Sequence, residues 1–439
     1  MPDEFPPAAA AARAGDAGLA LRAADAFALI ATTALPIALL HARAVADVLL
    51  SAVGALFLLR SALLGAWDWT ARPWVRVAIV LWLWLVFASG IEGAPHAVVQ
   101  AVVFVRLPLF VAACAAWALR PRRARRLLTI GTTLAALWLA VECWQQFATG
   151  SNLFGAHRFF DGALTGPFVK PHAGASYLAV LFPALLPPAL RLLRRPDWRA
   201  RTAALLLLAV AAATMVLIGQ RMPTLLMVLG LAMAALLLPA LRLPALAALG
   251  AGAAVLAATP IVSPPTYGKL VLHFLAQMDH FWISNYGQLY LRALAMVRAS
   301  PLFGVGVDGF RAHCLDIGYV KGARWFGLAQ SQVGPELGCN IHPHNYWLEM
   351  ATSGGVPALL AFAALAALWL GEAARGLDAA AQPMRAALLV MLAVLLWPIA
   401  STSSLFVVDA GGWVFVAAGW ALAESASDVR SDGQADARA

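Results

Sequence analysis

Two histidines stand two residues apart in the segment His342-Pro-His344-Asn345-Tyr, directly before a long apolar stretch of the chain. Imidazole changes its protonation state near neutral pH, so a histidine at this position is suited to accept a proton from a reacting hydroxyl group. The alternative is that these imidazoles only cap a helix or bond to neighbouring groups. The sequence leaves open which of the two is the base, and Asn345 beside them is a candidate to bind a polar substrate.

Arg221 is the second candidate for chemistry. It stands in Gly219-Gln-Arg-Met-Pro, a minimal turn between two apolar segments. An ionised side chain in such surroundings is expected to have a function, although it can also simply extend to the lipid head groups. Arg292 and Arg298 stand six residues apart in the segment YLRALAMVRASP, so on one helix they are about 120° from sharing a face. We therefore expect them to have separate tasks, with Arg298 assigned to substrate binding.

A third group of polar residues occurs in the segment HRFFDGALTGPFVKPH, which contains Arg158, Lys170 and His172. Basic residues gathered at one place indicate an anionic ligand, whereas scattered surface charge is the alternative. Arginine suits phosphate in particular, because its planar guanidinium donates paired hydrogen bonds and stays ionised. Together with Arg221 and Arg292, these residues predict a cavity that binds a lipid-linked phosphate or pyrophosphate.

The elements that carry these residues are expected to be helices in a membrane. Of the 439 residues, 62% are hydrophobic and 12% are charged, whereas a soluble domain has about 45–50% apolar and about 25% charged residues. This composition excludes a water-soluble enzyme and predicts an all-α, polytopic membrane protein. Apolar blocks long enough to span a bilayer predict about twelve transmembrane helices. Their expected positions are near residues 26–43, 46–65, 74–90, 98–119, 127–146, 173–193, 202–219, 222–240, 244–262, 345–370, 386–405 and 411–424.

The arginines predict the orientation of these helices. The net charge of +9 comes mostly from arginines that cluster between apolar blocks, as at residues 120–126 and 191–201. Such clusters favour the cytoplasmic side, so we assign them to topology and not to nucleic-acid binding. Both ends of the chain are then expected in the cytoplasm. A segment near 147–172 is expected on the opposite side.

This orientation divides the chain into four parts. Nine helices are expected over residues 1–262, and a large, partly helical external loop over residues 263–344. Three further helices are expected over residues 345–424. The polar residues 425–439 are expected to form a disordered cytoplasmic tail. An external loop of this length without an evident structural reason is usually functional.

Other kinds of chemistry lack the residues that they need. The chain has no GxxxxGKS phosphate loop and no Cys-x-x-Cys pair. The external carboxylates Asp308, Asp316 and Glu336 form no recognisable motif, so we expect neither a metal ion nor another cofactor. Cys314 and Cys339 share the large loop, and the sequence leaves open whether they form a disulfide in an oxidising compartment.

The order of these motifs resembles a known family. Arg221 in its turn is followed by YLRALAMVRASPLFGVGVDGF and then by HPHNYWLEMATSGGVPALLAF, an order similar to that of the superfamily of O-antigen ligases and O-antigen polymerases. The resemblance covers about residues 150–370. It implies a GT-C-like fold and a glycosyltransferase of the bacterial inner membrane, with its active site on the periplasmic face. It also implies that His344 is the essential histidine and that Arg221 and Arg292 bind a pyrophosphate.

For the ligases, the resemblance implies transfer of a polysaccharide from undecaprenyl pyrophosphate to the lipid A-core oligosaccharide, which completes lipopolysaccharide. His344 would accept the proton of the acceptor hydroxyl, and one direct displacement would invert the anomeric centre without a metal ion. The expected partners are this glycan donor, the lipid A-core and membrane lipids. Related alternatives are an O-antigen polymerase and a protein O-oligosaccharyltransferase, which differ in the acceptor. An alternative of another class is a lipid-linked oligosaccharide flippase or transporter, which needs no histidine beside a large external loop.

Overall fold

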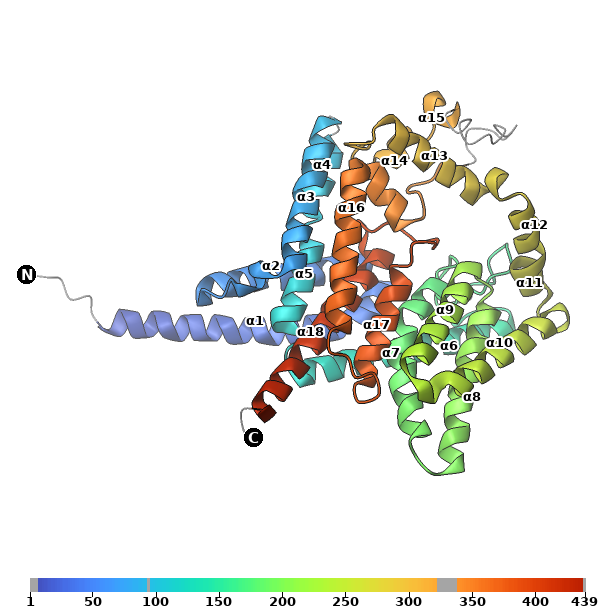
Figure 1. Cartoon of the computed structure of the whole chain (residues 1–439), viewed down its shortest axis with the longest axis horizontal. Coiled ribbons are helices and arrows are strands. Elements are labelled where there is room, and N and C mark those ends of the chain that lie inside the picture. Colours follow the sequence, from blue (N-terminus) through green and yellow to red (C-terminus); the bar gives the residue numbers. More distant parts are fainter. Residues whose placement is uncertain (1–6, 93–94, 322–337, 437–439) are drawn as a thin grey trace, which may run out of the picture.

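The computed structural model describes residues 7–92, 95–321 and 338–436 of the chain, and its regular structure within these ranges is helical (Figure 1). An isolated β-bridge between Ser151 and His157 is the exception among these residues. The α-helices are α1 (Pro7–His41), α2 (Arg43–Leu64), α3 (Pro73–Ile91), α4 (Pro95–Val103), α5 (Arg106–Ala113), α6 (Arg122–Thr149), α7 (Ala173–Leu193), α8 (Trp198–Ile218), α9 (Arg221–Leu237), α10 (Arg242–Val262), α11 (Pro264–Tyr267), α12 (His273–Asp279), α13 (Asn285–Ala299), α14 (Gly309–His313), α15 (Ile317–Lys321), α16 (Tyr346–Ala374), α17 (Pro383–Leu395) and α18 (Val408–Asp436).

Nine helices of the described residues are long and apolar enough to cross a membrane. One of these candidate spans, Pro95–Ala118, combines α4, α5 and a following π-helical turn. Each of the twelve segments predicted from hydropathy overlaps a helix, but α9 and α17 are apolar helices of only 17 and 13 residues. The structure therefore supports a multi-pass membrane protein, and the number of twelve spans stays a prediction.

Two differences between the predicted and the observed elements concern the C-terminal part of the chain. The prediction of one continuous span over residues 386–405 is wrong, because α17 ends at Leu395 and an irregular segment follows it. Pro398 explains this end, since proline lacks the amide hydrogen of a helix and disfavours helical geometry in the residue before it. In contrast, α18 continues as a helix past Glu424 to Asp436, through residues for which the sequence predicted disorder. That stretch has no proline and extends a helix that is already nucleated.

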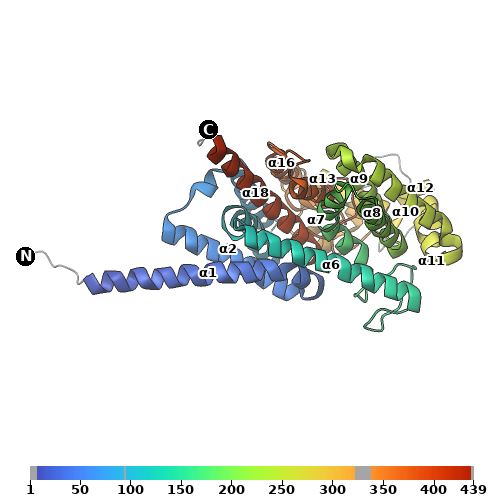
Figure 2. The same ribbon diagram turned by 90° about the horizontal axis from the view of Figure 1, so that it is seen from below.

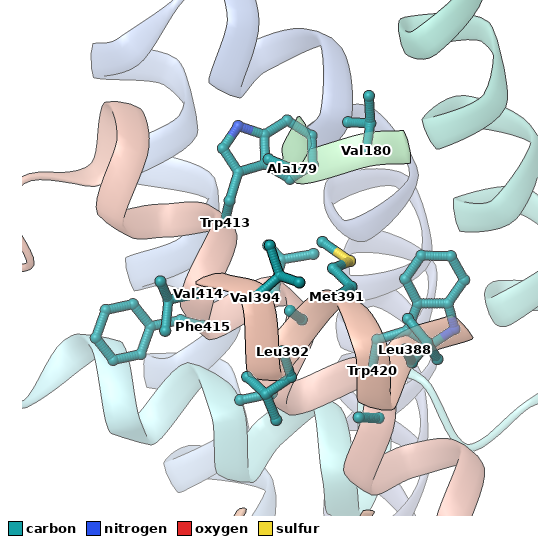
Figure 3. Packing of buried hydrophobic residues seen from close by; sticks show 14 of the residues in the cluster. Ala179, Val180, Leu388, Met391, Leu392, Val394, Trp413, Val414, Phe415 and Trp420 are labelled. Atoms are coloured by element: carbon teal, nitrogen blue, oxygen red, sulfur yellow. The ribbon is translucent and has the colours of Figure 1, made fainter. Parts of the chain in front are cut away.

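The core of the bundle lies where α7, α17 and α18 meet. Figure 3 shows Met391 and Leu392 of α17 between Trp413 and Trp420 of α18, with Val180 of α7 close by. All five side chains are buried. Lipid tails are as apolar as these side chains, so close packing is expected to stabilise this core more than transfer out of water does.

The outer helices expose apolar side chains. On α6, which lies along α1 (Figure 2), a stripe of exposed residues recurs every three or four positions. This stripe consists of Ile130, Leu134, Leu137 and Val141. Spacing of this kind places the side chains on one face of the helix. An exposed apolar face is expected to lie against lipid.

Contacts between distant parts of the chain sort the loops into two ends. At one end, Arg72 forms an ion pair with Glu372, and Arg125 forms one with Glu424. At the other end, contacts join five parts of the chain: residues 41–43, 147–172, 219–221, 396–407, and the described residues of the large loop, 263–321 and 338–344. We call this the site end. The structure therefore brings together the loops that the arginines assigned to one side, while the side of the membrane on which they lie stays a prediction.

Candidate functional site

Asn345 joins the start of α16 to the irregular segment 396–407. Its side-chain oxygen accepts hydrogen bonds from the backbone N–H groups of Trp347 and Leu348, at 2.9 and 3.0 Å, as a helix cap. Its amide nitrogen donates to the carbonyls of Pro398 and Ala400, at 2.7 and 3.0 Å. The amide thus uses its whole hydrogen-bonding capacity inside the protein. In this structure Asn345, which the sequence predicts to bind substrate, holds the motif in place.

His344 is clamped to Thr402 by two hydrogen bonds. The carbonyl of His344 accepts from the N–H of Thr402 at 2.8 Å, and the imidazole Nδ1 lies 3.0 Å from the carbonyl of Thr402. These bonds hold His344 at φ 51°, a left-handed conformation that costs on the order of 1–3 kcal/mol in a non-glycine residue. Strain of this kind is typical of functional sites and requires a surrounding structure that enforces it.

The hydrogen bonds of His344 define its tautomer. A carbonyl only accepts, so Nδ1 carries the proton and donates it to Thr402. Nε2 then has the lone pair and accepts from the amide nitrogen of Asn340 at 3.0 Å. The orientation of that amide is fixed independently, because its oxygen accepts from the N–H of Ile341 at 2.7 Å. His344 therefore presents a basic nitrogen.

His342 has the opposite tautomer. Its Nδ1 accepts from the backbone N–H of His344 at 3.2 Å, so the proton lies on Nε2. Burial lowers the pKa of His342 to about 3, and the neighbouring imidazole of His344 acts in the same direction. Burial also lowers the pKa of His344 below its ordinary 6.5, against an opposing effect of the Thr402 carbonyl. Both rings are neutral at pH 7, and the geometry favours His344 over His342 as a base.

Arg221 is the first residue of α9 and is held by the α11–α12 region. Its Nε donates to the carbonyl of Lys269 at 2.8 Å, and one terminal nitrogen donates to the side-chain oxygen of Gln277. The guanidinium also lies over the ring of Phe274, 5.9 Å from its centre. Gly219 allows the sharp turn before α9, since it adopts φ 74°. The turn predicted from the sequence is therefore confirmed, and its arginine is fixed in position.

A chain of side chains leads from Arg221 to the histidines. The amide nitrogen of Gln277 donates to the hydroxyl of Ser284 at 3.3 Å. Ser284 caps α13 by accepting from a backbone N–H of its first turn. Tyr286, in that same turn, lies with its ring centre 5.9 Å from that of His344. The structure thus connects these two sequence-predicted residues through the start of α13.

Arg292 lies on the buried face of α13. Its side chain is only 3% exposed, and one terminal nitrogen donates to the carbonyl of Cys314 at 2.6 Å. Cys314 forms a disulfide with Cys339, the residue before Asn340, with the two Cα atoms 5.1 Å apart. In this structure Arg292 therefore supports the loop that carries Asn340 to His344. Arg298 is exposed, which confirms that the two arginines occupy different faces.

Arg158 belongs to the same end but contacts other partners. One terminal nitrogen donates to the hydroxyl of Ser263 at 3.0 Å, and burial lowers the pKa of the guanidinium. The adjacent Asp161 forms an ion pair with Lys269, whose carbonyl binds Arg221. Arg158 is thereby tied to the region that holds Arg221.

The other two basic residues of the predicted cluster remain at the surface. Lys170 and His172 are exposed, and the ring of His172 packs edge-on against Phe168 at 6.0 Å. Neither is joined to the histidine motif by a described contact. The structure thus ties Arg158 to the region of Arg221. It also ties Pro171, which lies between Lys170 and His172, to the turn before α9, because the Pro171 carbonyl accepts from the side-chain amide of Gln220.

A cavity of about 290 Å³ with both polar and apolar wall residues lies beside His342. Its wall includes the neutral imidazole of His342, the amide of Gln100 and the ionisable side chains of Arg43, Asp308, Arg311 and Glu349. Arg43 belongs to none of the motifs predicted from the sequence. The orientation predicted from the arginine clusters places it at the end of the first span, on the same side of the membrane as His342. The segment 396–407 was also missed, and Trp397-Pro and the run Ser401-Thr-Ser-Ser within a supposed span were the available signals.

The described residues contain no group of three or more histidine, cysteine, aspartate or glutamate side chains arranged to hold a metal ion. Asp308 pairs with Arg311, and Asp316 contacts His313 at 2.8 Å. Glu336 lies outside the described residues. Chemistry without a metal ion therefore stays a prediction for a biochemical test.

Comparison with known proteins finds one family that the central part of the chain resembles. Residues 176–363 match the family described as O-antigen ligase. A search of curated proteins found no match. The matched residues include Arg221, Arg292 and both histidines of the motif, and they exclude Arg158 and Arg43.

Proposed function

We propose, because residues 176–363 match the O-antigen ligase family, that the chain transfers a glycan from undecaprenyl pyrophosphate to the lipid A-core oligosaccharide. The observation that carries the proposal is the tautomer of His344, whose Nε2 lone pair faces away from its anchor on Thr402. A glycosyl transfer of this kind needs one base and a leaving group that can hold negative charge. The site end supplies candidates for both tasks.

The reaction removes one proton from the acceptor hydroxyl and releases undecaprenyl pyrophosphate. His344 Nε2 accepts the proton as the acceptor oxygen forms a bond to the anomeric carbon, which contributes typically about 10²–10⁴ in rate. The bond between that carbon and the pyrophosphate oxygen breaks, and the electron pair leaves with the lipid pyrophosphate. One displacement inverts the anomeric centre. Because the donor is already activated, the reaction needs neither a nucleotide nor a metal ion.

Asn340 occupies the basic nitrogen in the resting structure. Its amide donates to His344 Nε2 at 3.0 Å, so the acceptor hydroxyl must replace this contact when it binds. The disulfide beside Asn340 and the bond from Arg292 to Cys314 position the loop that carries it. We therefore assign Arg292 a positioning role in this state, and its direct contact with pyrophosphate remains a separate prediction.

Arg221 is the proposed contact of the leaving pyrophosphate. The carbonyl of Lys269 and the amide of Gln277 fix its guanidinium before substrate arrives. A donor that is fixed in advance where negative charge develops is worth on the order of 10²–10³ in rate. Arg158, tied to the same region through Ser263, adds positive charge nearby. Lys170, His172 and Arg298 remain candidates for binding the substrate at the surface.

The proposed location is the bacterial inner membrane, with the site end on the periplasmic face. Nine apolar helices among the described residues support the membrane, and the disulfide Cys314–Cys339 supports an oxidising compartment. The arginine clusters at the opposite end favour the cytoplasm. Undecaprenyl-linked glycans would reach such a site from the outer leaflet.

An O-antigen polymerase or a protein O-oligosaccharyltransferase would use the same base and the same leaving group with another acceptor. A purified preparation in nanodiscs therefore receives undecaprenyl-pyrophosphate-linked glycan together with lipid A-core, a second lipid-linked glycan or a serine-containing peptide, in separate reactions with EDTA. We expect the lipid A-core to become larger. Growth of the glycan-lipid or the peptide instead would assign the acceptor to one of these relatives.

Activity that EDTA abolishes and a divalent ion restores would contradict the metal-free mechanism. Transport of the intact donor without transfer would indicate a flippase.

A further inference from the structure

The cavity beside His342 is separate from the surroundings of Arg221. His342 contributes to its wall, whereas His344, whose ring centre is 4.3 Å from that of His342, contacts Tyr286. Neither Arg221 nor its partners Lys269 and Gln277 line this space. The volume of about 290 Å³ is close to the lower end of small-molecule pockets, about 300–1,000 Å³. The histidine motif therefore borders two separate regions, which are the cavity beside His342 and the surroundings of Arg221.

The cavity wall suits a sugar. Side chains of Gln100, Ser403 and Ser404 provide amide and hydroxyl groups, and the Nε2–H of His342 is a donor. Phe310 provides an apolar surface for a ring. A few placed polar groups beside an aromatic side chain are typical of small-molecule sites.

In the part of the chain that the structure describes, Arg43 is the cation of this wall that has no protein partner. Within the described residues, its guanidinium makes no hydrogen bond or ion pair. The other cation, Arg311, pairs with Asp308. The carboxylate of Glu349 is engaged as well, since it accepts from the backbone N–H of Leu405 at 2.6 Å. Arg43 is thus the cation of this wall that is available to a ligand, while Glu349 contributes a buried acidic side chain to the same wall.

The side of the membrane gives a second reason to expect an anion beside Arg43. In the proposed orientation Arg43 opposes the bias of arginine toward the cytoplasmic side. An anionic ligand would offset this effect.

We propose that this cavity binds an acidic sugar of the acceptor glycolipid, with Arg43 as the contact for its phosphate or carboxylate group. The inference rests on the proposed glycosyl transfer and adds the place of the acceptor. The donor pyrophosphate lies on the Arg221 side, the acceptor enters from the His342 side, and the two meet at His344. The sugar-like wall and its continuity with the histidine motif favour the acceptor over a phospholipid head group.

The test separates binding of the acceptor from binding of the donor. Initial rates of transfer are measured for wild type, Arg43→Ala and Arg43→Glu, with either substrate varied. We expect Arg43→Ala to raise the KM for lipid A-core about tenfold or more, the size of a lost charge-assisted hydrogen bond, and to leave the KM for the donor unchanged. Arg43→Glu should raise the acceptor KM further. The matched control is Arg76→Ala, an exposed arginine in the first turn of α3 at the opposite end.

A chemical change in the acceptor completes the test. With lipid A-core whose phosphate groups are removed and carboxyl groups reduced, wild type and Arg43→Ala should have the same KM. An equal KM for Arg43→Ala and Arg76→Ala on the native acceptor would overturn the inference. A higher KM of Arg43→Ala that persists on the neutral acceptor would also overturn it. If the difference in KM disappeared in zwitterionic nanodiscs, Arg43 would bind a phospholipid instead.

A binding measurement distinguishes failure of this inference from failure of the proposed function. Equilibrium dialysis with radiolabelled core oligosaccharide, released from lipid A, needs no turnover. Weaker binding to Arg43→Ala than to Arg76→Ala would support the cavity even if wild type transferred no glycan to lipid A-core. If wild type transferred glycan normally and both variants bound the core oligosaccharide equally, the proposed function would stand. The cavity would then not be the acceptor site.

Discussion

The two imidazoles of the motif differ because each has one nitrogen occupied by the backbone. Thr402 accepts from His344 Nδ1 and leaves Nε2 basic, whereas the N–H of His344 occupies His342 Nδ1 and leaves a donor at Nε2. The sequence shows two histidines of equal chemical type. It could not show their tautomers, because the group that orients His344 lies 58 positions further along the chain.

The rate of transfer should depend on pH through His344. The neutral imidazole is the active form, and burial lowers its pKa below 6.5. Activity should therefore be complete at pH 7 and decrease only as the pH falls below about 6.5, as the ring gains a proton. The measurement is kcat against pH at saturating substrates, with elution volume on a sizing column as a control for folding. A profile whose acid limb lies above pH 7 would contradict a base with a lowered pKa.

Arg221→Lys should lose about 10²-fold or more in kcat even though the charge is kept. One ammonium group cannot bind the carbonyl of Lys269 and the amide of Gln277 and still present a paired donor to phosphate. Arg201→Lys, an exposed arginine near the start of α8 at the opposite end, is the control. Equal activity of the two lysine variants would remove paired phosphate binding from the mechanism.

A break inside α16 contacts the glycine-rich turn at residues 303–310, which lies in the large loop. At Gly354 and Gly355 the backbone leaves helical geometry. The freed groups then bind the preceding turn: Val305 N–H donates to the carbonyl of Thr352 at 2.7 Å, and Val356 N–H donates to that of Pro301 at 2.8 Å. The glycine-rich turn and the start of α16 thus position each other.

Gly355→Ala should destabilise the protein strongly. Gly355 adopts φ 69° and ψ −166°, which is essentially restricted to glycine, and a Cβ atom there would overlap the carbonyl oxygen of Leu302. We expect a loss of at least about 1–3 kcal/mol and a lower unfolding temperature, measured by intrinsic fluorescence in detergent. Gly371→Ala in the same helix has no atom within 4 Å of the new Cβ and should be neutral or stabilising. If both variants unfolded at the same temperature, the break in α16 would not require glycine.

Hydropathy predicted the existence of most helices and misplaced the segment after α17. The predicted spans 127–146 and 202–219 begin too late, because the arginines at 122–126 and at 199 and 201 lie inside the first turns of α6 and α8. The apolar residues Trp397, Ile399 and Leu405 raise the mean hydropathy of the segment after α17. This segment is therefore counted as part of the predicted span 386–405. Irregular backbone at this depth requires internal partners, and here Trp347 and Asn345 donate to its carbonyls. Partners so far away in the sequence could not be predicted from it.

The distribution of arginine across the two ends of the bundle is the basis of the proposed orientation. The clusters at 120–126 and 191–201 lie at the end opposite the site. The site end has fewer arginines, and the described contacts give several of them specific partners, as for Arg158, Arg221 and Arg292. The sequence predicted this separation, because charge bias does not depend on tertiary contacts. The pairing of each arginine does depend on them and could not be predicted.

Labelling of single cysteines in intact cells tests this orientation. Lys170→Cys at the site end should react with a membrane-impermeant maleimide, whereas Arg195→Cys should react only after the cells are permeabilised; both positions are exposed. The native thiols are expected to give little background, since Cys114 and Cys143 are buried and the other two form a disulfide. Labelling of Arg195→Cys in intact cells, without labelling of Lys170→Cys, would place the site in the cytoplasm.

The most direct test of His344 as the base compares two histidine variants in one transfer assay. Purified wild type, His344→Gln and His342→Gln receive undecaprenyl-pyrophosphate-linked glycan and lipid A-core in EDTA, and the extended lipid A-core is quantified. Glutamine keeps a donor at position 342 but supplies no proton acceptor of comparable strength at position 344. We predict that His344→Gln loses about 10²-fold or more in kcat, while His342→Gln keeps most of its activity. Near-normal transfer by His344→Gln with an inactive His342→Gln would contradict the assignment of His344 as the base.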